Sequence, residues 1–191
     1  MTEKLCWRVT YMARETPPEE TPPPAPVSGI TFNHKADISV DAYRNLHRMV
    51  GEKWLWWERL ALDDAALGIL IFHPNTDIYT LCVDGELAGF AEINCSKAKA
   101  PAIRYFGLMP DFIGKRLGGF MMESLLHRVS QPPVRQVTLD TCDLDHPAAI
   151  DFYRRHQFKE TSTEVQSAED PRMAGILPKT AAPHIPLNRQ L

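Results

Sequence analysis

The chain lacks the features that mark secreted, membrane-spanning or nucleic-acid-binding proteins. Its 191 residues include only four cysteines, all isolated, with no Cys-x-x-Cys pair. Isolated, reduced thiols favour a cytoplasmic protein over a disulfide-stabilised one. No apolar run approaches the roughly 20 residues that span a bilayer, and no signal peptide is visible at the N-terminus. Because the net charge is -3, we expect neither a nucleic-acid-binding nor a membrane-binding surface.

The most informative segment runs from Ile103 to Val129. Ile103–Leu108 is typical of an extended apolar strand, and Leu117–Val129 carries apolar residues at helical spacing. Between them lies the loop Met109–Arg116. A strand that enters a helix through such a loop leaves the first helical N–H groups unpaired, and the helix dipole adds partial positive charge there. The loop therefore suits a phosphate or a pyrophosphate.

Two well-known phosphate motifs do not describe this loop. It lacks the order Gly, four residues, Gly, Lys, Ser or Thr that defines a Walker A motif. It also lacks the dinucleotide motif Gly-x-Gly-x-x-Gly, because Arg116 stands where a glycine is needed. Gly114, Gly118 and Gly119 nevertheless allow an anion to approach the backbone closely.

The loop instead resembles motif A of the GNAT superfamily, the acyl-CoA-dependent N-acetyltransferases. That motif commonly reads Pro, acidic, aromatic, Arg or Gln, Gly, Lys, Gly, aliphatic, Gly. Pro110–Gly118 follows it, with Ile113 in place of Arg or Gln and Arg116 in place of a glycine.

A second segment, His146–Phe158, is similar to motif B of the same superfamily, Asn-x-x-Ala-x-x-x-Tyr-x-x-x-Gly-Phe. Ala149, Tyr153 and Phe158 keep the pattern, whereas His146 replaces the Asn and Gln157 the Gly. The two motifs occur in the family's order, and the resemblance covers roughly residues 77–166.

The predicted elements agree with the α/β fold that this resemblance implies, a mixed central sheet with helices on both faces. Two strands joined by the helix of motif A are expected to be parallel, and in the family this pair splays apart. Gly107 either marks a bulge that opens the pair or allows close packing. The expected strands are Leu5–Ala13, Gly29–Asn33, Asp77–Val83, Leu87–Asn94, Ile103–Leu108, Gln136–Thr141 and Phe158–Gln166, and the expected helices begin near Ser39, Asp63, Leu117 and Pro147.

The chain is expected to form one domain. We assign it residues 1–167, including a proline-rich loop at 16–26 that is unsuited to helix or sheet. Residues 168–191 form a proline-rich tail that either packs on the domain or trails from it. A homodimer is an option that the sequence leaves open.

The resemblance implies that acetyl-CoA is the co-substrate and that its acetyl group passes directly to an amino group of a small molecule or peptide. The alternative is a non-catalytic acyl-CoA-binding module with the same fold. No metal is expected, because Cys142 and the segment Asp143–His146 lack zinc-ligand spacing. The expected cofactor-binding residues are Phe106, Gly107, Leu108, Ile113, Gly114, Lys115, Arg116, Leu117, Gly118 and Gly119.

Three residues are candidates for proton transfer. The resemblance places Tyr153 beside the thioester sulfur, where a phenol can protonate a thiolate; the alternative is a core tyrosine. Glu92 lies in an apolar strand, where burial raises a carboxyl pKa towards the range useful to a base; the alternative is a surface salt bridge at the end of the strand. His146 is either a proton relay or a helix-capping or structural histidine.

The segment Trp54–Trp57 has the most unusual composition in the chain. In the family this region borders the acceptor pocket, and Trp54, Trp57 and Tyr105 are our candidates for acceptor binding. Indoles bind aromatic groups and, through cation–π attraction, cations; the alternative is that they form core. Because consecutive residues of a helix or strand point in different directions, at most one of Trp56 and Trp57 is expected to face the acceptor.

Overall fold

The structure, a computed structural model, describes residues 4–16, 23–26 and 28–191. Residues 17–22 of the predicted proline-rich loop at 16–26 thus lie outside the described residues.

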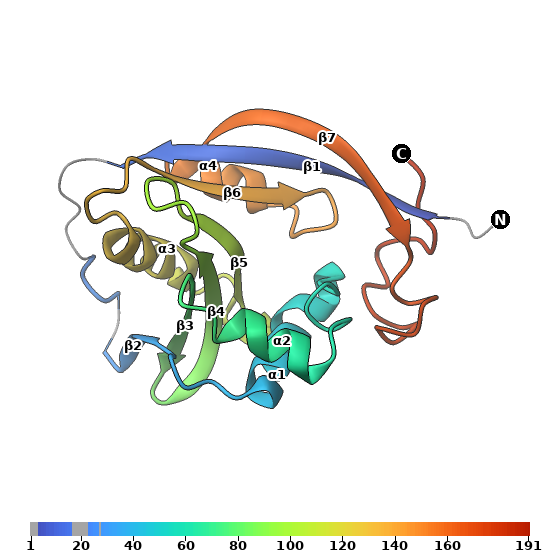
Figure 1. Ribbon diagram of the computed structural model, residues 1–191, viewed down its shortest axis with the longest axis horizontal. Coiled ribbons are helices and arrows are strands. Elements are labelled where there is room, and N and C mark those ends of the chain that lie inside the picture. Colours follow the sequence, from blue (N-terminus) through green and yellow to red (C-terminus); the bar gives the residue numbers. More distant parts are fainter. Residues whose placement is uncertain (1–3, 17–22, 27) are drawn as a thin grey trace.

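One seven-stranded sheet has the order β2-β3-β4-β5-β6-β1-β7 (Figure 1). Its strands are β1 (Lys4–Glu15), β2 (Ile30–His34), β3 (Thr76–Val83), β4 (Glu86–Asn94), β5 (Ala102–Leu108), β6 (Gln136–Cys142) and β7 (Lys159–Glu169). The helices are α1 (Val40–Gly51), α2 (Asp64–Ile71), α3 (Leu117–Val129) and α4 (Ala149–Arg155), with short 3₁₀ turns η1 (Glu52–Trp54) and η2 (Pro110–Phe112).

Local signals account for where several elements begin and end. The Ser39 side chain accepts a hydrogen bond from the Ala42 amide at 3.2 Å and so caps α1. Asp63 caps α2 in the same way, through the Ala66 amide at 2.8 Å. The β3–β4 hairpin turns at Asp84 and Gly85, whose φ angles of 50° and 84° are those that tight hairpin turns require.

The sheet opens between its two parallel strands. β5 and β6 pair only at Ala102–Thr138 and Ile103–Leu139, and every other strand pair is antiparallel. Beyond Ile103 the backbone edge of β5 has no partner in β6, so its polar groups are available to a ligand. The predicted α/β fold, with a mixed sheet and a splayed parallel pair, is confirmed.

Gly107 does not form the bulge. The register of β4 and β5 shifts between Tyr105 and Ile103, so the extra residue is Arg104. Gly107 keeps its partner Phe90, and a Cβ there would lie 2.4 Å from the Val50 side chain. The alternative of close packing therefore describes this glycine, and α1 approaches the sheet over it.

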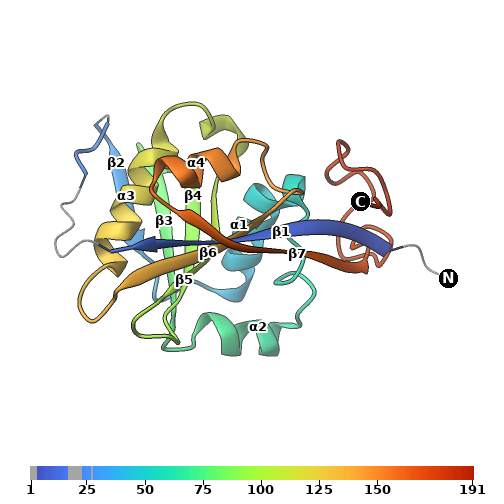
Figure 2. The same ribbon diagram turned by 90° about the horizontal axis from the view of Figure 1, so that it is seen from above.

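Helices cover both faces of the sheet. Phe106 stacks on Phe152 of α4, with ring centroids 5.7 Å apart, whereas the next residue, Gly107, faces α1. Because consecutive strand residues point to opposite faces, α1 and α4 lie on opposite sides of β5. α3 lies on the same side as α4, since Gly118 faces Phe152 and Leu108 (Figure 2). No helix of the described residues is long and apolar enough to cross a membrane.

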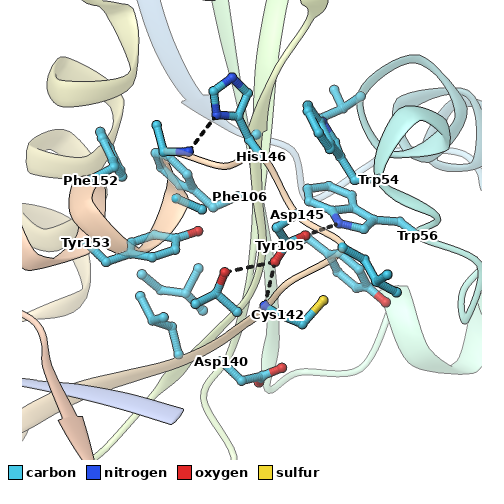
Figure 3. A pocket seen from close by; sticks show the side chains of 18 of the residues that line it. Trp54, Trp56, Tyr105, Phe106, Asp140, Cys142, Asp145, His146, Phe152 and Tyr153 are labelled. Carbon is cyan, nitrogen blue, oxygen red and sulfur yellow. Dashed lines mark hydrogen bonds between the residues drawn. The ribbon is translucent and has the colours of Figure 1, made fainter. Parts of the chain in front are cut away.

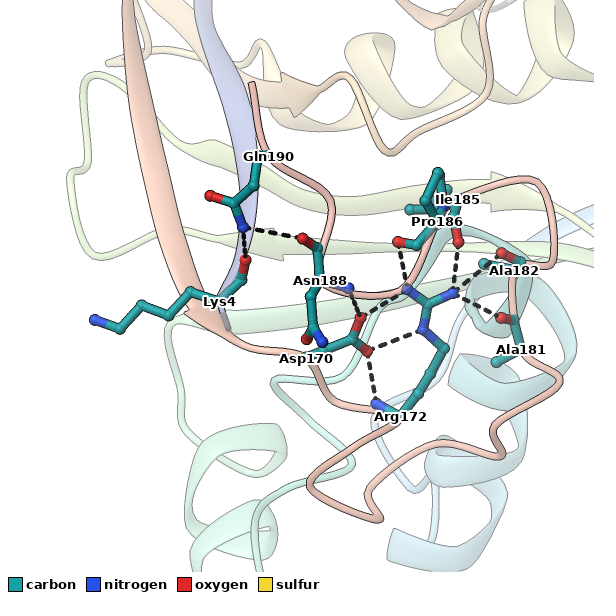
Figure 4. Close-up of polar contacts among 9 residues, drawn as sticks. All are labelled: Lys4, Asp170, Arg172, Ala181, Ala182, Ile185, Pro186, Asn188 and Gln190. Carbon is teal, nitrogen blue, oxygen red and sulfur yellow. Dashed lines mark hydrogen bonds and ion pairs between the residues drawn. The ribbon is translucent and has the colours of Figure 1, made fainter. Parts of the chain in front are cut away.

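Residues 170–191 lie against the start of β1, held by one buried arginine (Figure 4). Arg172 is 2% exposed and binds the fully buried Asp170 through two hydrogen bonds of 2.9 and 2.7 Å. The same guanidinium donates to the carbonyl oxygens of Ile185 at 2.7 Å and Pro186 at 3.0 Å. Apolar residues of this segment join a second cluster, made of Leu5, Trp7, Val9, Leu55, Leu144, Leu177, Ala181, Ala182 and Ile185.

Candidate active site

A pocket of about 720 Å³ lies at the fork between β5 and β6. Its lining comes mainly from β1, from η1 and the segment after it, from β5, the start of α3, β6 and α4, with one residue each from α1 and β7. Figure 3 shows Phe152 and Tyr153 of α4 on one side, and Trp54 and Trp56 on the other. The splayed strands thus bring motif A, motif B and the tryptophan-rich segment to one cavity.

Eight of the ten expected cofactor-binding residues line this pocket, namely Phe106, Gly107, Leu108, Ile113, Gly114, Arg116, Gly118 and Gly119. The other two do not. Leu117 is only 3% exposed and packs in the core, and the ammonium of Lys115 lies 4.9 Å from the ring centroid of Phe112.

The start of α3 fits a phosphate-bearing ligand. Its N-cap residue, Arg116, makes no side-chain capping hydrogen bond, and the first turn has no acidic residue. The first amides of this 13-residue helix are therefore open to an anion. A Cβ added at Gly119 would meet no atom within 4 Å, so the backbone there borders open space. Arg116 itself has a φ of 62°, which is uncommon for a residue other than glycine.

Tyr153 lies on α4 with 9% of its surface exposed. Its hydroxyl is directed into the pocket (Figure 3) and makes no hydrogen bond with the described part of the chain. Burial raises the pKa of Tyr153 above its ordinary value, and the carboxylates of Asp145 and Asp140 raise it further. The hydroxyl therefore stays protonated at neutral pH, as a proton donor must.

Asp145 ties the two sides of the pocket together. Its carboxylate accepts hydrogen bonds from the Thr141 hydroxyl at 2.9 Å, the Cys142 amide at 3.0 Å and the Trp56 indole at 3.1 Å (Figure 3). Three donors hold it in place, so we read it as an anchor for the indole rather than as a base.

His146 also lines the pocket. Its Nδ1 accepts a hydrogen bond from the Ala148 amide at 3.0 Å, next to the start of α4, and its ring lies 5.2 Å from that of Trp54. This contact closes the turn before α4 and does not cap the helix, whose N-cap residue Ala148 has no side-chain capping hydrogen bond; it fits a structural histidine.

Glu92 lies outside the pocket lining. Its side chain is 2% exposed, pairs with Arg59 at 2.6 Å and accepts a hydrogen bond from the Tyr43 hydroxyl. A carboxylate that is enclosed and paired in this way cannot reach an acceptor amine. The salt-bridge alternative thus describes Glu92, although the bridge is buried rather than exposed.

Glu58 is the pocket carboxylate that the sequence reasoning missed. It lines the pocket and accepts a hydrogen bond from the Tyr105 hydroxyl at 3.2 Å. The residue keeps exposed surface, which we attribute to its facing the cavity. Burial raises the pKa of Glu58, while hydrogen bonds from its own backbone amide and from Tyr105 act in the opposite direction. The sequence feature that could have identified Glu58 is its position directly after the tryptophan-rich segment Trp54–Trp57.

All four tryptophans of the chain line the pocket. Both Trp56 and Trp57 are thus among the lining residues, and the expectation that at most one of them faces the acceptor stays a prediction. Both residues lie in irregular backbone after Leu55, whose φ of 55° reverses the chain, so the alternation of a regular element does not apply. Trp57 packs edge-on against Trp7, with centroids 5.2 Å apart.

Cys142 is the thiol of the pocket lining. Burial raises its pKa, as does the charge of Asp145. Because the thiolate is the nucleophilic form, this cysteine is a poor acyl carrier. Among the described residues, no group of three or more His, Cys, Asp or Glu side chains is arranged to hold a metal ion.

Solved structures with a similar fold include acetyltransferases. A GCN5-related N-acetyltransferase from Sphaerobacter thermophilus matches at TM-score 0.59 and 13% identity, over 86% of this chain and 52% of that one. One from Kribbella flavida matches at TM-score 0.57 and 17% identity, over 88% and 60%. The chain thus spans little more than half the length of these two.

A shorter enzyme also matches, an aminoglycoside acetyltransferase from an uncultured soil metagenomic sample, solved with sisomicin. The TM-score is 0.54 at 13% identity, over 66% of this chain and 86% of that one. A comparison with curated protein sequences finds no match. The family model described as acetyltransferase (GNAT) family matches residues 40–158, and the chain therefore belongs to the GNAT acetyltransferase family.

Proposed function

We propose that this protein transfers an acetyl group from acetyl-CoA directly to a primary amine of a small molecule or peptide. The observation that carries the proposal is the pocket at the fork of the sheet. Its lining includes Tyr153, whose phenol makes no hydrogen bond with the described residues, the accessible carboxylate Glu58, and the start of α3 with its open amides.

The donor end would be formed by α3 and β5. The first amides of α3, with Gly118 and Gly119, would hold the pyrophosphate, and the guanidinium of Arg116 would add positive charge beside it. The unpaired backbone edge of β5 beyond Ile103 would bind the arm and the thioester carbonyl. Acetyl-CoA supplies an already activated thioester, so the chain's own residues need only position the reactants and move protons.

The two proton transfers would be divided between the walls of the pocket. Glu58 would accept a proton from the acceptor ammonium, directly or through a water, because it lines the cavity, keeps exposed surface and has a raised pKa. Tyr153 would donate its proton to the departing thiolate. Direct transfer is favoured over an acyl-enzyme route because the pKa of Cys142 is raised and its thiolate disfavoured.

The experiment measures amine-dependent release of CoA thiol as a function of pH, for the wild type and for Glu58→Gln. We expect kcat/KM of the wild type to fall as the pH drops through the raised pKa of Glu58, because the base becomes protonated. Glu58→Gln should lower kcat/KM by on the order of 10²–10⁴-fold and remove that acid limb.

Glu86→Gln is the matched control, since Glu86 is an exposed residue at the start of β4 outside the pocket lining. An unchanged pH profile in Glu58→Gln would exclude Glu58 as the base. Binding of CoA with no amine-dependent thiol release by the wild type would favour the non-catalytic binding module instead.

A further inference from the structure

Charge is distributed unevenly along the pocket. Its lining carries three carboxylates, namely Glu58 bonded to Tyr105, Asp145 bonded to Trp56, and Asp140 on β6. One arginine, Arg104, lies among them, and it is already paired with Asp140 at 3.2 Å. The end of the pocket at Trp56 and Tyr105, which we call the acceptor end, therefore carries the carboxylates of Asp145 and Glu58, whereas Arg116 at the start of α3 belongs to the donor end.

Of these three carboxylates, Glu58 alone has neither an ion-pair partner among the described residues nor three hydrogen-bond donors. Asp145 is satisfied by its three hydrogen-bond donors, and Asp140 is engaged with Arg104. Glu58 has the Tyr105 hydroxyl as its hydrogen-bond partner among side chains of the described residues, which leaves acceptor positions on its carboxylate unused. The acceptor end thus offers one site for one ammonium group.

The rest of the acceptor end is aromatic and rigidly supported. Trp7 and Trp57 form an edge-to-face pair, and Tyr105 packs on Trp56 with centroids 5.2 Å apart. The C-terminal segment backs this wall, since Leu177 and Ile185 share a buried cluster with Trp7, against which Trp57 also packs. Indoles held in this way present preformed flat apolar surfaces.

We propose that the acceptor is a monoamine whose amino group is carried by an aromatic body and has no carboxylate beside it. This inference rests on the proposed function and specifies its substrate class. The ammonium would pair with Glu58, and the ring would lie on the indoles, with a cation–π contribution. An α-carboxylate would be repelled by Glu58. The two arginines that act on Glu58, Arg59 and Arg104, already pair with Glu92 and Asp140.

Calorimetry can test this class of acceptor without turnover if the protein is saturated with CoA, which carries no acetyl group to transfer. Phenethylamine, phenylalanine and butylamine are the probes, because the first two differ only in the carboxylate and the first and third in the ring. We expect phenethylamine to bind at least about tenfold more tightly than either. Glu58→Gln should weaken phenethylamine by about tenfold and reduce its advantage over phenylalanine.

Two results would overturn the inference. One is binding of phenylalanine or butylamine as tight as that of phenethylamine. The other is an unchanged phenethylamine affinity in Glu58→Gln. If the same protein fails to bind CoA in the calorimeter, the proposed function fails. If CoA binds and an aliphatic amine or a polyamine such as spermidine drives thiol release better than phenethylamine, the acceptor class alone is refuted.

Discussion

Replacing Tyr153 with phenylalanine separates catalysis from packing. The substitution removes one hydroxyl that makes no hydrogen bond with the described residues and leaves the ring in place against Phe152 and Phe158, at centroid distances of 5.5 and 6.1 Å. No buried partner is left unsatisfied. The free energy of unfolding should therefore change by no more than about 0.5 kcal/mol.

The effect on catalysis should be much larger. A general acid contributes on the order of 10²–10⁴-fold, which corresponds to about 3–6 kcal/mol of transition-state stabilisation at about 1.4 kcal/mol per tenfold. We expect kcat of Tyr153→Phe to fall by that factor, while the calorimetric affinity for acetyl-CoA stays within about twofold.

The assay is release of CoA thiol at saturating amine, together with thermal unfolding of each variant. Tyr79→Phe is the matched control, because Tyr79 is 8% exposed on β3 and lies outside this pocket. An unchanged kcat in Tyr153→Phe would make Tyr153 a packing residue or show that protonation of the thiolate does not limit the rate. A loss of kcat accompanied by a loss of several kcal/mol of stability would equally refute the reasoning.

Three further predictions concern the donor end, the tail and the sheet. Gly119→Val should weaken CoA binding by at least about tenfold in calorimetry, because the side chain would enter the open space beside the first amides of α3. The melting temperature should not fall, because a Cβ at this position meets no protein atom within 4 Å. Unchanged affinity would mean that CoA binds elsewhere. Arg172→Met should cost about 3–5 kcal/mol in chemical unfolding, because it leaves Asp170 buried and unpaired; a change as small as that of the exposed control Arg154→Met would contradict this. Gly107→Ala should cost about 1–3 kcal/mol by crowding Val50, and full stability would show that α1 can move away.

Local sequence signals predicted most of the fold. Ser39, Asp63 and the Asp84–Gly85 turn act within a few residues of where they stand, so their hydrogen bonds and φ angles follow from the sequence alone. The parallel pair followed from the order strand, helix, strand. The position of the bulge did not, because Arg104 becomes the extra residue only through the register of β4 against β5.

The chemistry of the site was harder to predict because it depends on partners distant in sequence. The sequence around Glu92 predicts a candidate base, but in the fold its carboxylate pairs with the guanidinium of Arg59, which lies 33 residues away in the sequence. Glu58 became a candidate only when the fold placed it beside Tyr105, 47 residues away. The irregular backbone around Leu55, which turns both Trp56 and Trp57 into the pocket, carries no periodic signal at all.

The central claim is direct acetyl transfer from acetyl-CoA to a primary amine. The most direct measurement is mass spectrometry of the purified wild-type protein mixed with acetyl-CoA, first without and then with phenethylamine or a simple aliphatic amine. The account predicts no acetylated protein in the absence of amine, and one N-acetylated amine for each CoA thiol released in its presence. A stoichiometric acetyl-enzyme on Cys142 would contradict direct transfer, and CoA binding with no acetylated amine from any primary amine would contradict the enzymatic function itself.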